Sequence, residues 1–329
     1  MKKITRFNFF PKPTPIEFLE NLSGCLNGPK IFLKRDDLTG IALGGNKVRK
    51  LEYLLADAVS KSCDLIITTG GPQSNHARIT AGICASMGLT CVLVLCGKKP
   101  KVLEGNMLLD KIFGAKIVYA GTDDFSEIDK LIEKISKEGR KKGFTPYVIP
   151  MGGTNGLGEV GNVECFIEII TQLKRMKEKI DYIVLTNGSS GTHAGLEVGK
   201  VITGSKIEIA GINVQFDKAE TVDRIYKGIE ETFSVLGMEN KHNTGLRVYG
   251  DYIKPGYGKT NKLTLEAISL MGKKEGIVLD TIYTGKAFGG FIDLIRKKVF
   301  TKKDNVLFMH TGGYPGIVAM PAKDKRFFK

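Results

Sequence analysis

Long apolar runs are missing from this chain of 329 residues. None reaches the roughly 18 apolar residues that a helix needs to cross a bilayer, which argues against a membrane protein. Residues 1–10 carry charges but no apolar stretch with a small-residue cleavage site, so we expect no signal peptide and a cytoplasmic location. Repeats and Pro- or Ser-rich linkers are also absent, so composition alone marks no domain boundary.

Metal-binding patterns are lacking as well. The cysteines form no C-x-x-C pair and no histidine cluster accompanies them, so no metal site is expected. Each cysteine lies in or beside an apolar stretch, where a free thiol is usually buried and reduced. The six are Cys25, Cys63, Cys84, Cys91, Cys96 and Cys165.

Charge of one sign is in excess, because the formal net charge is +14. Such a charge is typical of proteins that bind nucleic acid or an acidic surface. The lysines are spread along the chain, however, and aromatic residues do not alternate with them as a base-stacking surface requires. A lysine-rich surface that attracts small anionic ligands is the better account, and we do not expect nucleic acid as a partner.

Strand-like and helix-like segments alternate along the chain, which favours an α/β fold with parallel sheets covered on both faces. Ligands of such folds bind at the carboxyl ends of the strands. The predicted strands are 31–34, 65–69, 91–95, 117–119, 146–150, 182–185, 207–214 and 306–309. The predicted helices begin at 46 and 192 or span 75–87, 104–113, 125–142 and 157–177.

Two glycine-containing turns are candidates for binding an anionic cofactor. Gly44-Gly45-Asn46-Lys47 precedes an amphipathic helix, although an ordinary solvated lysine has the same appearance. Asn187-Gly188-Ser189-Ser190-Gly191-Thr192 separates a strand from a helix, where backbone N–H groups and hydroxyls suit a phosphate. It does not match the dinucleotide fingerprint, and Gly258-Lys259-Thr260 is no P-loop because Ile253 replaces the first glycine. A reactive lysine and a phosphate site on one α/β chain indicate pyridoxal phosphate.

Two further polar turns follow predicted strands. In Gly70-Gly71-Pro72-Gln73-Ser74-Asn75-His76, Ser74 or Asn75 could cap the next helix. Capping accounts for one polar residue but not for four in a row. His310-Thr311-Gly312-Gly313 ends the last strand and, taken alone, could be a simple turn.

Taken together, these segments resemble the 1-aminocyclopropane-1-carboxylate deaminase and D-cysteine desulfhydrase family, in order and without a large gap from about Phe7 to the end. The resemblance implies a pyridoxal-phosphate-dependent enzyme of fold type II, which is tryptophan-synthase-β-like, with two open parallel-sheet α/β domains. Residues 1–50 and 164–329 would form the larger, cofactor-binding domain and 51–163 the smaller one. It also implies a homodimer. The segments that carry it are Phe32-Leu33-Lys34-Arg35-Asp36-Asp37, Gly44-Gly45-Asn46-Lys47-Val48-Arg49-Lys50-Leu51-Glu52, Gln73-Ser74-Asn75-His76 and His310-Thr311-Gly312-Gly313.

Carried over position by position, the resemblance also implies roles for individual residues. Lys47 would carry the cofactor and later move the α-proton, and Asn75 would hydrogen-bond the ring hydroxyl. The implied catalytic residues are Lys47, Ser74, Tyr257 and Tyr283. The implied cofactor-binding residues are Lys47, Asn75, Ser189, Ser190, Gly191, Thr192 and Thr311, and those for the substrate, chiefly near its carboxylate, are Ser74, Asn75 and His76.

Two positions distinguish branches of the family. Members that open the cyclopropane ring resemble one another in having a glutamate after the second tyrosine and no threonine before the last Gly-Gly. This chain has Thr284 and Thr311 there, which is the desulfhydrase pattern. We therefore expect elimination of D-cysteine to pyruvate, hydrogen sulfide and ammonia. The alternatives are 1-aminocyclopropane-1-carboxylate deamination, a lyase of another β-substituted amino acid such as cysteate or β-chloroalanine, and a non-catalytic ligand sensor.

Overall fold

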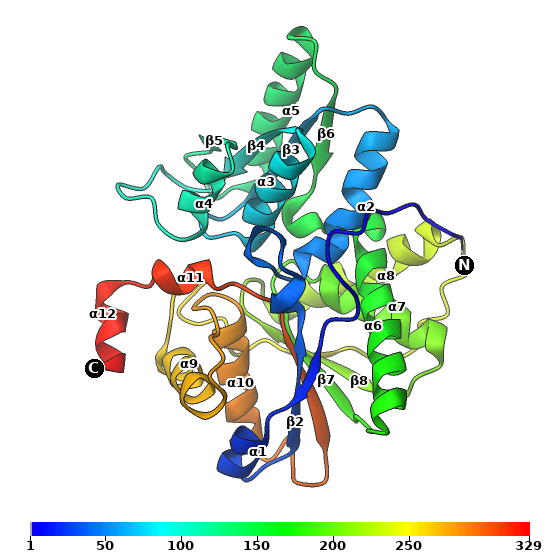
Figure 1. Ribbon diagram of the computed structural model, residues 1–329, viewed down its shortest axis with the longest axis vertical. Coiled ribbons are helices and arrows are strands. Elements are labelled where there is room, and N and C mark those ends of the chain that lie inside the picture. Colours follow the sequence, from blue (N-terminus) through cyan, green and yellow to red (C-terminus); the bar gives the residue numbers. More distant parts are fainter. Residues whose placement is uncertain (1) are drawn as a thin grey trace.

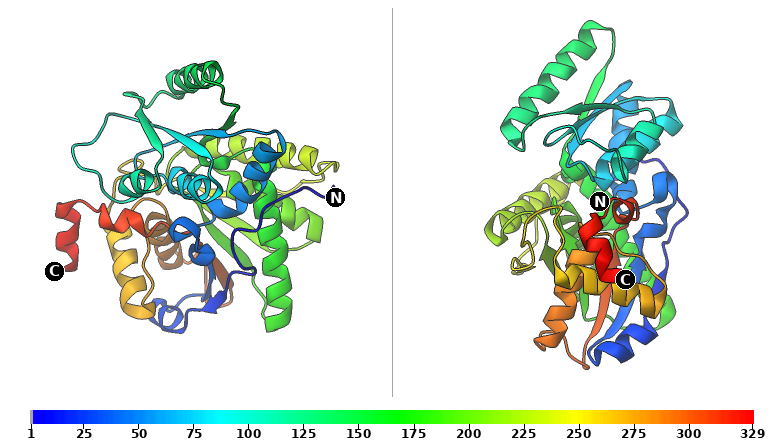
Figure 2. Two further views of the ribbon diagram at one scale, coloured as in Figure 1. Left: turned by 45° about the horizontal axis from the view of Figure 1, so that its top comes forward. Right: turned by 90° about the vertical axis from the view of Figure 1, so that its left-hand side faces the viewer.

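The computed structural model describes residues 2–329 and contains two separate sheets, one above the other in Figures 1 and 2. The larger sheet has the strand order β1-β2-β10-β7-β8-β9, and the smaller one has the order β5-β4-β3-β6. The strands of the larger sheet are β1 (Ile16–Phe18), β2 (Lys30–Arg35), β7 (Tyr182–Asn187), β8 (Glu208–Asn213), β9 (Arg247–Tyr249) and β10 (Asn305–His310). Those of the smaller sheet are β3 (Leu65–Gly70), β4 (Thr90–Leu95), β5 (Lys116–Tyr119) and β6 (Pro146–Ile149).

Helices cover both faces of each sheet, as buried parallel strands require. Those before β7 are α1 (Glu20–Leu26), α2 (Lys47–Ser60), α3 (Asn75–Met87), α4 (Asn106–Ile112), α5 (Phe125–Lys141) and α6 (Gly156–Met176). Those after it are α7 (Gly191–Thr203), α8 (Lys218–Val235), α9 (Lys262–Glu275), α10 (Thr284–Arg296), α11 (Pro315–Val318) and α12 (Ala322–Lys325). Among residues 2–329, no helix combines the length and apolarity needed to cross a membrane.

The smaller sheet shows how the sequence pattern creates its packing. Side chains of a strand alternate between its two faces, so an apolar run is buried on both. In β3, Ile66 joins the core formed with α2 and α3, whereas Leu65 and Ile67 pack with Ile128 and Ile132 of α5. The sheet is thus enclosed from both sides.

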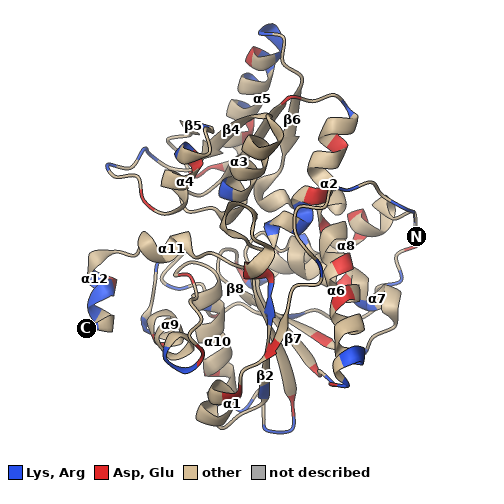
Figure 3. Ribbon diagram, viewed as in Figure 1, with Lys and Arg blue, Asp and Glu red and all other residues tan. Residues whose placement is uncertain are grey.

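The larger sheet is built in the same way. One face packs on α9 and α10, where Phe288 and Phe291 lie against Phe308 of β10. The other face packs on α6 and α7, where Phe166 and Leu196 are buried. Figure 3 shows that the Lys and Arg residues are distributed over the helices and loops around both sheets.

The α/β prediction of parallel sheets is confirmed, with one difference in the larger sheet. All strand pairs are parallel except β1 with β2, which is antiparallel. A strand as short as β1 at a sheet edge leaves little pattern to recognise, and none was predicted there. The proposed division at residues 51–163 remains a prediction; both of its boundaries fall inside helices, α2 and α6.

The cysteine prediction needs one correction. Five of the six thiols are buried and all six are free, but Cys25 is exposed. It belongs to the short helix α1, of which only Leu22 is buried. Lying beside apolar residues was therefore not enough to bury this side chain.

Candidate active site

A cavity of about 380 Å³ lies at the carboxyl ends of strands from both sheets. Ligand cavities are commonly of this size and lie at this position in open α/β sheets. Ten of the eleven residues predicted for the site line it: Lys47, Ser74, Asn75, His76, Ser189, Ser190, Thr192, Tyr257, Tyr283 and Thr311. The eleventh, Gly191, is not among the lining residues, although it begins α7 beside them.

Lys47 is the first residue of α2 and lines the cavity. Within residues 2–329, its amine forms no hydrogen bond or ion pair. Burial lowers the pKa of this amine well below its ordinary value, and the nearby Lys50 lowers it further, while Glu159 acts in the opposite direction. A lysine amine held neutral in this way is a nucleophile suited to forming a Schiff base.

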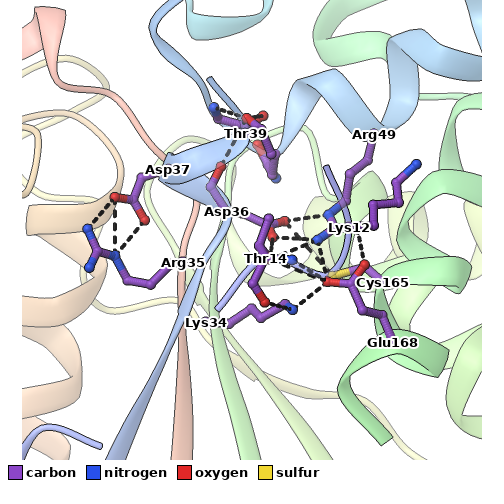
Figure 4. Close-up of polar contacts among 12 residues, drawn as sticks. Lys12, Thr14, Lys34, Arg35, Asp36, Asp37, Thr39, Arg49, Cys165 and Glu168 are labelled. Carbon is purple, nitrogen blue, oxygen red and sulfur yellow. Dashed lines mark hydrogen bonds and ion pairs between the residues drawn. The ribbon is translucent and has the colours of Figure 1, made fainter. Parts of the chain in front are cut away.

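A buried ionic network holds α2 behind Lys47 (Figure 4). Arg49 donates to both oxygens of Asp36, at 2.7 and 2.8 Å, and to Glu168 of α6 at 2.9 Å. Lys34 of β2 pairs with the same Glu168. Lys34, Asp36 and Arg49 belong to the segments that carry the family resemblance, and Glu168 does not. Together the four residues link β2, α2 and α6, which fixes where the first turn of α2 lies.

The four polar residues Gln73 to His76 span the start of α3, and their separate tasks explain why they occur together. Ser74 caps α3 by accepting the Ala77 N–H at 3.2 Å. Gln73 donates to Glu104 O at 2.9 Å and accepts from Asn106 N at 2.9 Å, so it holds the start of α4.

His76 presents a hydrogen-bond acceptor to its surroundings. Thr68 donates its hydroxyl proton to Ile149 O at 2.8 Å, so it accepts from His76 Nε2 at 2.8 Å. Burial lowers the pKa of His76 well below its ordinary value, with Lys47 and Lys50 adding to the effect. The imidazole is therefore neutral, and its Nδ1 is unprotonated and has no partner within residues 2–329.

The turn between β7 and α7 fits a phosphate group. Ser190 Oγ and Thr186 Oγ1 are buried without a hydrogen-bond partner in the described chain, although both residues line the cavity. Buried hydroxyls usually have partners, so these two are available to hydrogen-bond a ligand in the cavity. The N-terminus of the 13-residue helix α7 supplies free N–H groups beside them. A phosphate carried by a small cofactor matches this set of donors.

Lys50 lies directly behind the same turn. Its amine donates to Thr154 Oγ1 at 3.1 Å, and Thr154 in turn donates to Ser189 Oγ at 2.7 Å. A Cβ atom at position 191 would lie 2.4 Å from Lys50 Nζ, so a side chain there would displace this amine from its present place. Gly191 thus shapes the turn rather than lining the cavity.

Two tyrosines form the wall nearest α10. The Tyr257 and Tyr283 hydroxyls are hydrogen-bonded to each other, and their rings meet edge to face with centroids 5.9 Å apart. Burial raises the pKa of Tyr257 to about 12 and raises that of Tyr283 well above its ordinary value. Both hydroxyls therefore keep their protons at neutral pH.

Comparison with known proteins gives the family. The family model described as "Pyridoxal-phosphate dependent enzyme" matches residues 8–312. The chain belongs to this family. It is 40% identical over 317 residues to a putative 1-aminocyclopropane-1-carboxylate deaminase of Pyrococcus abyssi, covering 96% of this chain and 94% of that one. It is 39% identical over 329 residues to the D-cysteine desulfhydrase of Klebsiella pneumoniae, covering 97% and 98%.

Solved structures agree with the fold of this pyridoxal-phosphate-dependent enzyme. The crystal structure of an "ACC deaminase homologue" superposes with a TM-score of 0.91 at 40% identity, covering 99% of this chain and 97% of that one. Threonine deaminase isoform 2 of Solanum lycopersicum has a TM-score of 0.65 at 17% identity, covering 95% and 82%, which supports the fold alone. The predicted fold type and cofactor are confirmed.

Several residues around the cofactor site escaped the sequence interpretation. Lys50 belongs to the segment 44–52 that carries the family resemblance, but a second lysine on a helix is usually solvated. Arg78 and Asn106 contact Asn75 from α3 and α4, and no motif marks them. Of the two branch positions, Thr311 lines the cavity, whereas the Thr284 hydroxyl donates to Asp280 Oδ1 and Thr284 is not among the lining residues.

Proposed function

We propose that this enzyme eliminates hydrogen sulfide from D-cysteine and, with one water molecule, yields pyruvate and ammonia. The D-cysteine desulfhydrases of Klebsiella pneumoniae and Salmonella typhimurium, 39% and 38% identical, support this substrate and its chirality. Bound pyridoxal phosphate supplies an electron sink for the charge left when the α-proton is removed.

Thr311 is the observation that favours this reaction. It is the one branch position that lines the cavity. This chain carries a hydroxyl at both branch positions, and the glutamate of the ring-opening members would stand at Thr284 rather than here. A carboxylate beside the ring nitrogen would keep that nitrogen protonated and strengthen the sink, whereas a hydroxyl can only hydrogen-bond it. Hydrosulfide is a good leaving group, so its elimination needs less stabilisation than opening a carbon ring.

The protonation states suit the required proton transfers. Lys47 is neutral and can accept the α-proton at Nζ, because burial lowers the pKa of its amine. Tyr257 and Tyr283 hold protons at neutral pH, so either can donate one to the departing sulfur. The Ser74 hydroxyl oxygen accepts the Ala77 N–H, which leaves its proton free for the substrate carboxylate.

The test is sulfide release from D-cysteine by the purified holoenzyme, with L-cysteine measured in parallel. We expect release from the D form only, and its loss in Lys47→Ala. Pyruvate and sulfide should appear in equal amounts. An enzyme with bound cofactor that releases no sulfide from D-cysteine would contradict the proposal.

Deamination of 1-aminocyclopropane-1-carboxylate is the second candidate. It is favoured by the names of the Pyrococcus abyssi and Pyrococcus furiosus relatives, 40% and 42% identical. Formation of 2-oxobutyrate from this substrate, measured beside the D-cysteine reaction, separates the two. Faster turnover of the cyclopropane would show that a hydroxyl at Thr311 is compatible with ring opening.

We further propose that the enzyme works in the cytoplasm as a homodimer. Six free cysteines, five of them buried, fit a reducing compartment. Exposed apolar side chains on the loop before α4, on α4 itself and on α11 fit a surface that a second copy covers.

A further inference from the structure

A chain of amide contacts behind the cavity has only one possible orientation. Asn106 Nδ2 lies 2.8 Å from Gln73 O, a backbone carbonyl that can only accept a hydrogen bond. Asn106 Oδ1 lies 3.0 Å from Arg78 Nη1, a guanidinium nitrogen that can only donate. Both neighbours therefore place the amide nitrogen and oxygen of Asn106 in the same way.

The orientation of Asn106 determines that of Asn75. The second hydrogen of Asn106 Nδ2 is donated to the Asn75 side chain at 3.0 Å, so Asn75 must accept it with its Oδ1. Arg78 Nη1, 3.4 Å from the same oxygen, reinforces this choice. Asn75 lines the cavity, and its Nδ2 forms no hydrogen bond within residues 2–329. Its donor end is therefore left for a ligand.

We propose that Arg78 and Asn106 are positioning residues that hold the Asn75 amide with its N–H group toward the ring hydroxyl oxygen of pyridoxal phosphate. The inference rests on the proposed placement of Asn75 beside that oxygen. An amide turned the other way would present its carbonyl oxygen and repel an ionised ring hydroxyl. Neither residue is among those that line the cavity, so both would act through Asn75.

Arg78 also connects Asn75 to the lysine. Its Nη2 donates to Gly44 O at 2.6 Å, in the turn that leads into Lys47. The side chain is fully buried, with 0% exposure, so solvent cannot replace these contacts. One guanidinium thus holds two parts of the cavity's surroundings, the turn before Lys47 and the amide of Asn75.

The variant Asn106→Asp tests the proposal in the resting holoenzyme, without substrate. A carboxylate cannot donate to Asn75, so the Asn75 amide should turn, donate its N–H to the introduced carboxylate and present its own oxygen to the cofactor. A lost donor at the ring oxygen favours the protonated cofactor–lysine linkage. The pH midpoint of the cofactor's visible absorbance should therefore rise by about one unit, the equivalent of one hydrogen bond.

A double-mutant cycle separates positioning from a general effect of the new charge. Asn75→Ala should raise the midpoint by itself, and adding Asn106→Asp to it should change nothing more. Asn162→Asp, a buried asparagine of α6 away from the cavity lining, is the matched control and should leave the midpoint unchanged.

Two outcomes would overturn the inference: an unchanged midpoint in Asn106→Asp, or shifts that simply add in the double variant. If Asn106→Asp does not fold, Asn106→Ala removes the same donor and is measured in the same cycle. Because the absorbance is recorded without any amino acid, a wrong substrate assignment leaves this result intact.

Discussion

At the scale of single residues, burial determines the chemistry of this site more than residue identity does. Lys47 and Lys50 were both visible as lysines in the sequence, yet burial lowers the pKa of each amine in the folded chain. The pKa of Glu159 rises for the same reason. The sequence could name the candidate lysine through family resemblance, but it could not show which side chains the fold removes from solvent.

Asp110 of α4 provides a prediction at this scale. Both of its oxygens are buried without partners in the described chain, and burial raises its pKa from 3.8 to about 7, although Arg78 acts in the opposite direction. The folded state thus keeps a proton that the unfolded chain loses near pH 4. This residue therefore costs stability as the pH rises from about 4 to about 7, and the loss is complete above that range.

Replacing Asp110 with asparagine removes this dependence. We expect Asp110→Asn to be more stable than the parent at pH 8, by about 2 kcal/mol, and close to it at pH 5. Urea denaturation of the holoenzyme at both pH values measures the difference. A gap between the two proteins that stays constant with pH would show that Asp110 is ionised throughout.

At the scale of secondary structure, most elements between residues 30 and 214 and the strand β10 were readable from the sequence, whereas β1, α1 and the segment before β10 were not. The predicted helix 75–87 coincides with α3, because Ser74 supplies a cap and Gly88 ends the helix in a left-handed conformation. No element was predicted between 214 and 306, where α8, β9, α9 and α10 lie. In α10 nearly every position is buried, so the helix lacks a polar face that would reveal its period.

The cap of α3 gives a prediction in which stability and activity separate. Ser74→Ala should lower the free energy of unfolding by about 1 kcal/mol through the lost Ala77 contact. It should also raise KM for D-cysteine more than it lowers kcat, if Ser74 donates to the substrate carboxylate as proposed. Asn261→Ala removes the cap of α9, outside the cavity, and should reproduce only the first effect. A normal KM in Ser74→Ala would restrict Ser74 to capping.

At the scale of the whole molecule, function depends on residues that meet from distant parts of the chain. The cavity joins turns that follow β3, β4, β7, β8 and β10, which belong to two different sheets. The family resemblance identified most of these turns separately. The contacts of Arg78 with Gly44 and of Thr154 with Ser189 each join residues about 35 positions apart. Neither Arg78 nor Thr154 belongs to a predicted motif, so only the folded chain reveals these contacts.

The proposed homodimer is a prediction at the same scale. The apolar side chains that would be covered are exposed to between 52% and 67% of their surface and comprise Leu43, Val102, Ile112 and Val318. Their segments adjoin one another: a Cβ at position 105 would lie 3.0 Å from Ala319 Cβ, and one at position 82 would lie near both Ala42 and Phe113. This surface therefore includes residues from the regions of both sheets and lies close to the turns that lead into α2 and α4.

Substituting charged residues into this surface should dissociate the dimer. We expect the parent protein to sediment at twice the chain mass of 36.0 kDa and the double variant Ile112→Lys/Val318→Lys to sediment at that mass. In a two-fold dimer the introduced lysines of one copy would face those of the other, so like-charge repulsion would add to the loss of apolar contact. Val59→Lys changes an exposed apolar residue at the far end of α2 and should leave the dimer intact. A parent protein of single-chain mass would contradict the dimer, whereas a dimer that survives the double variant would place its interface on another face.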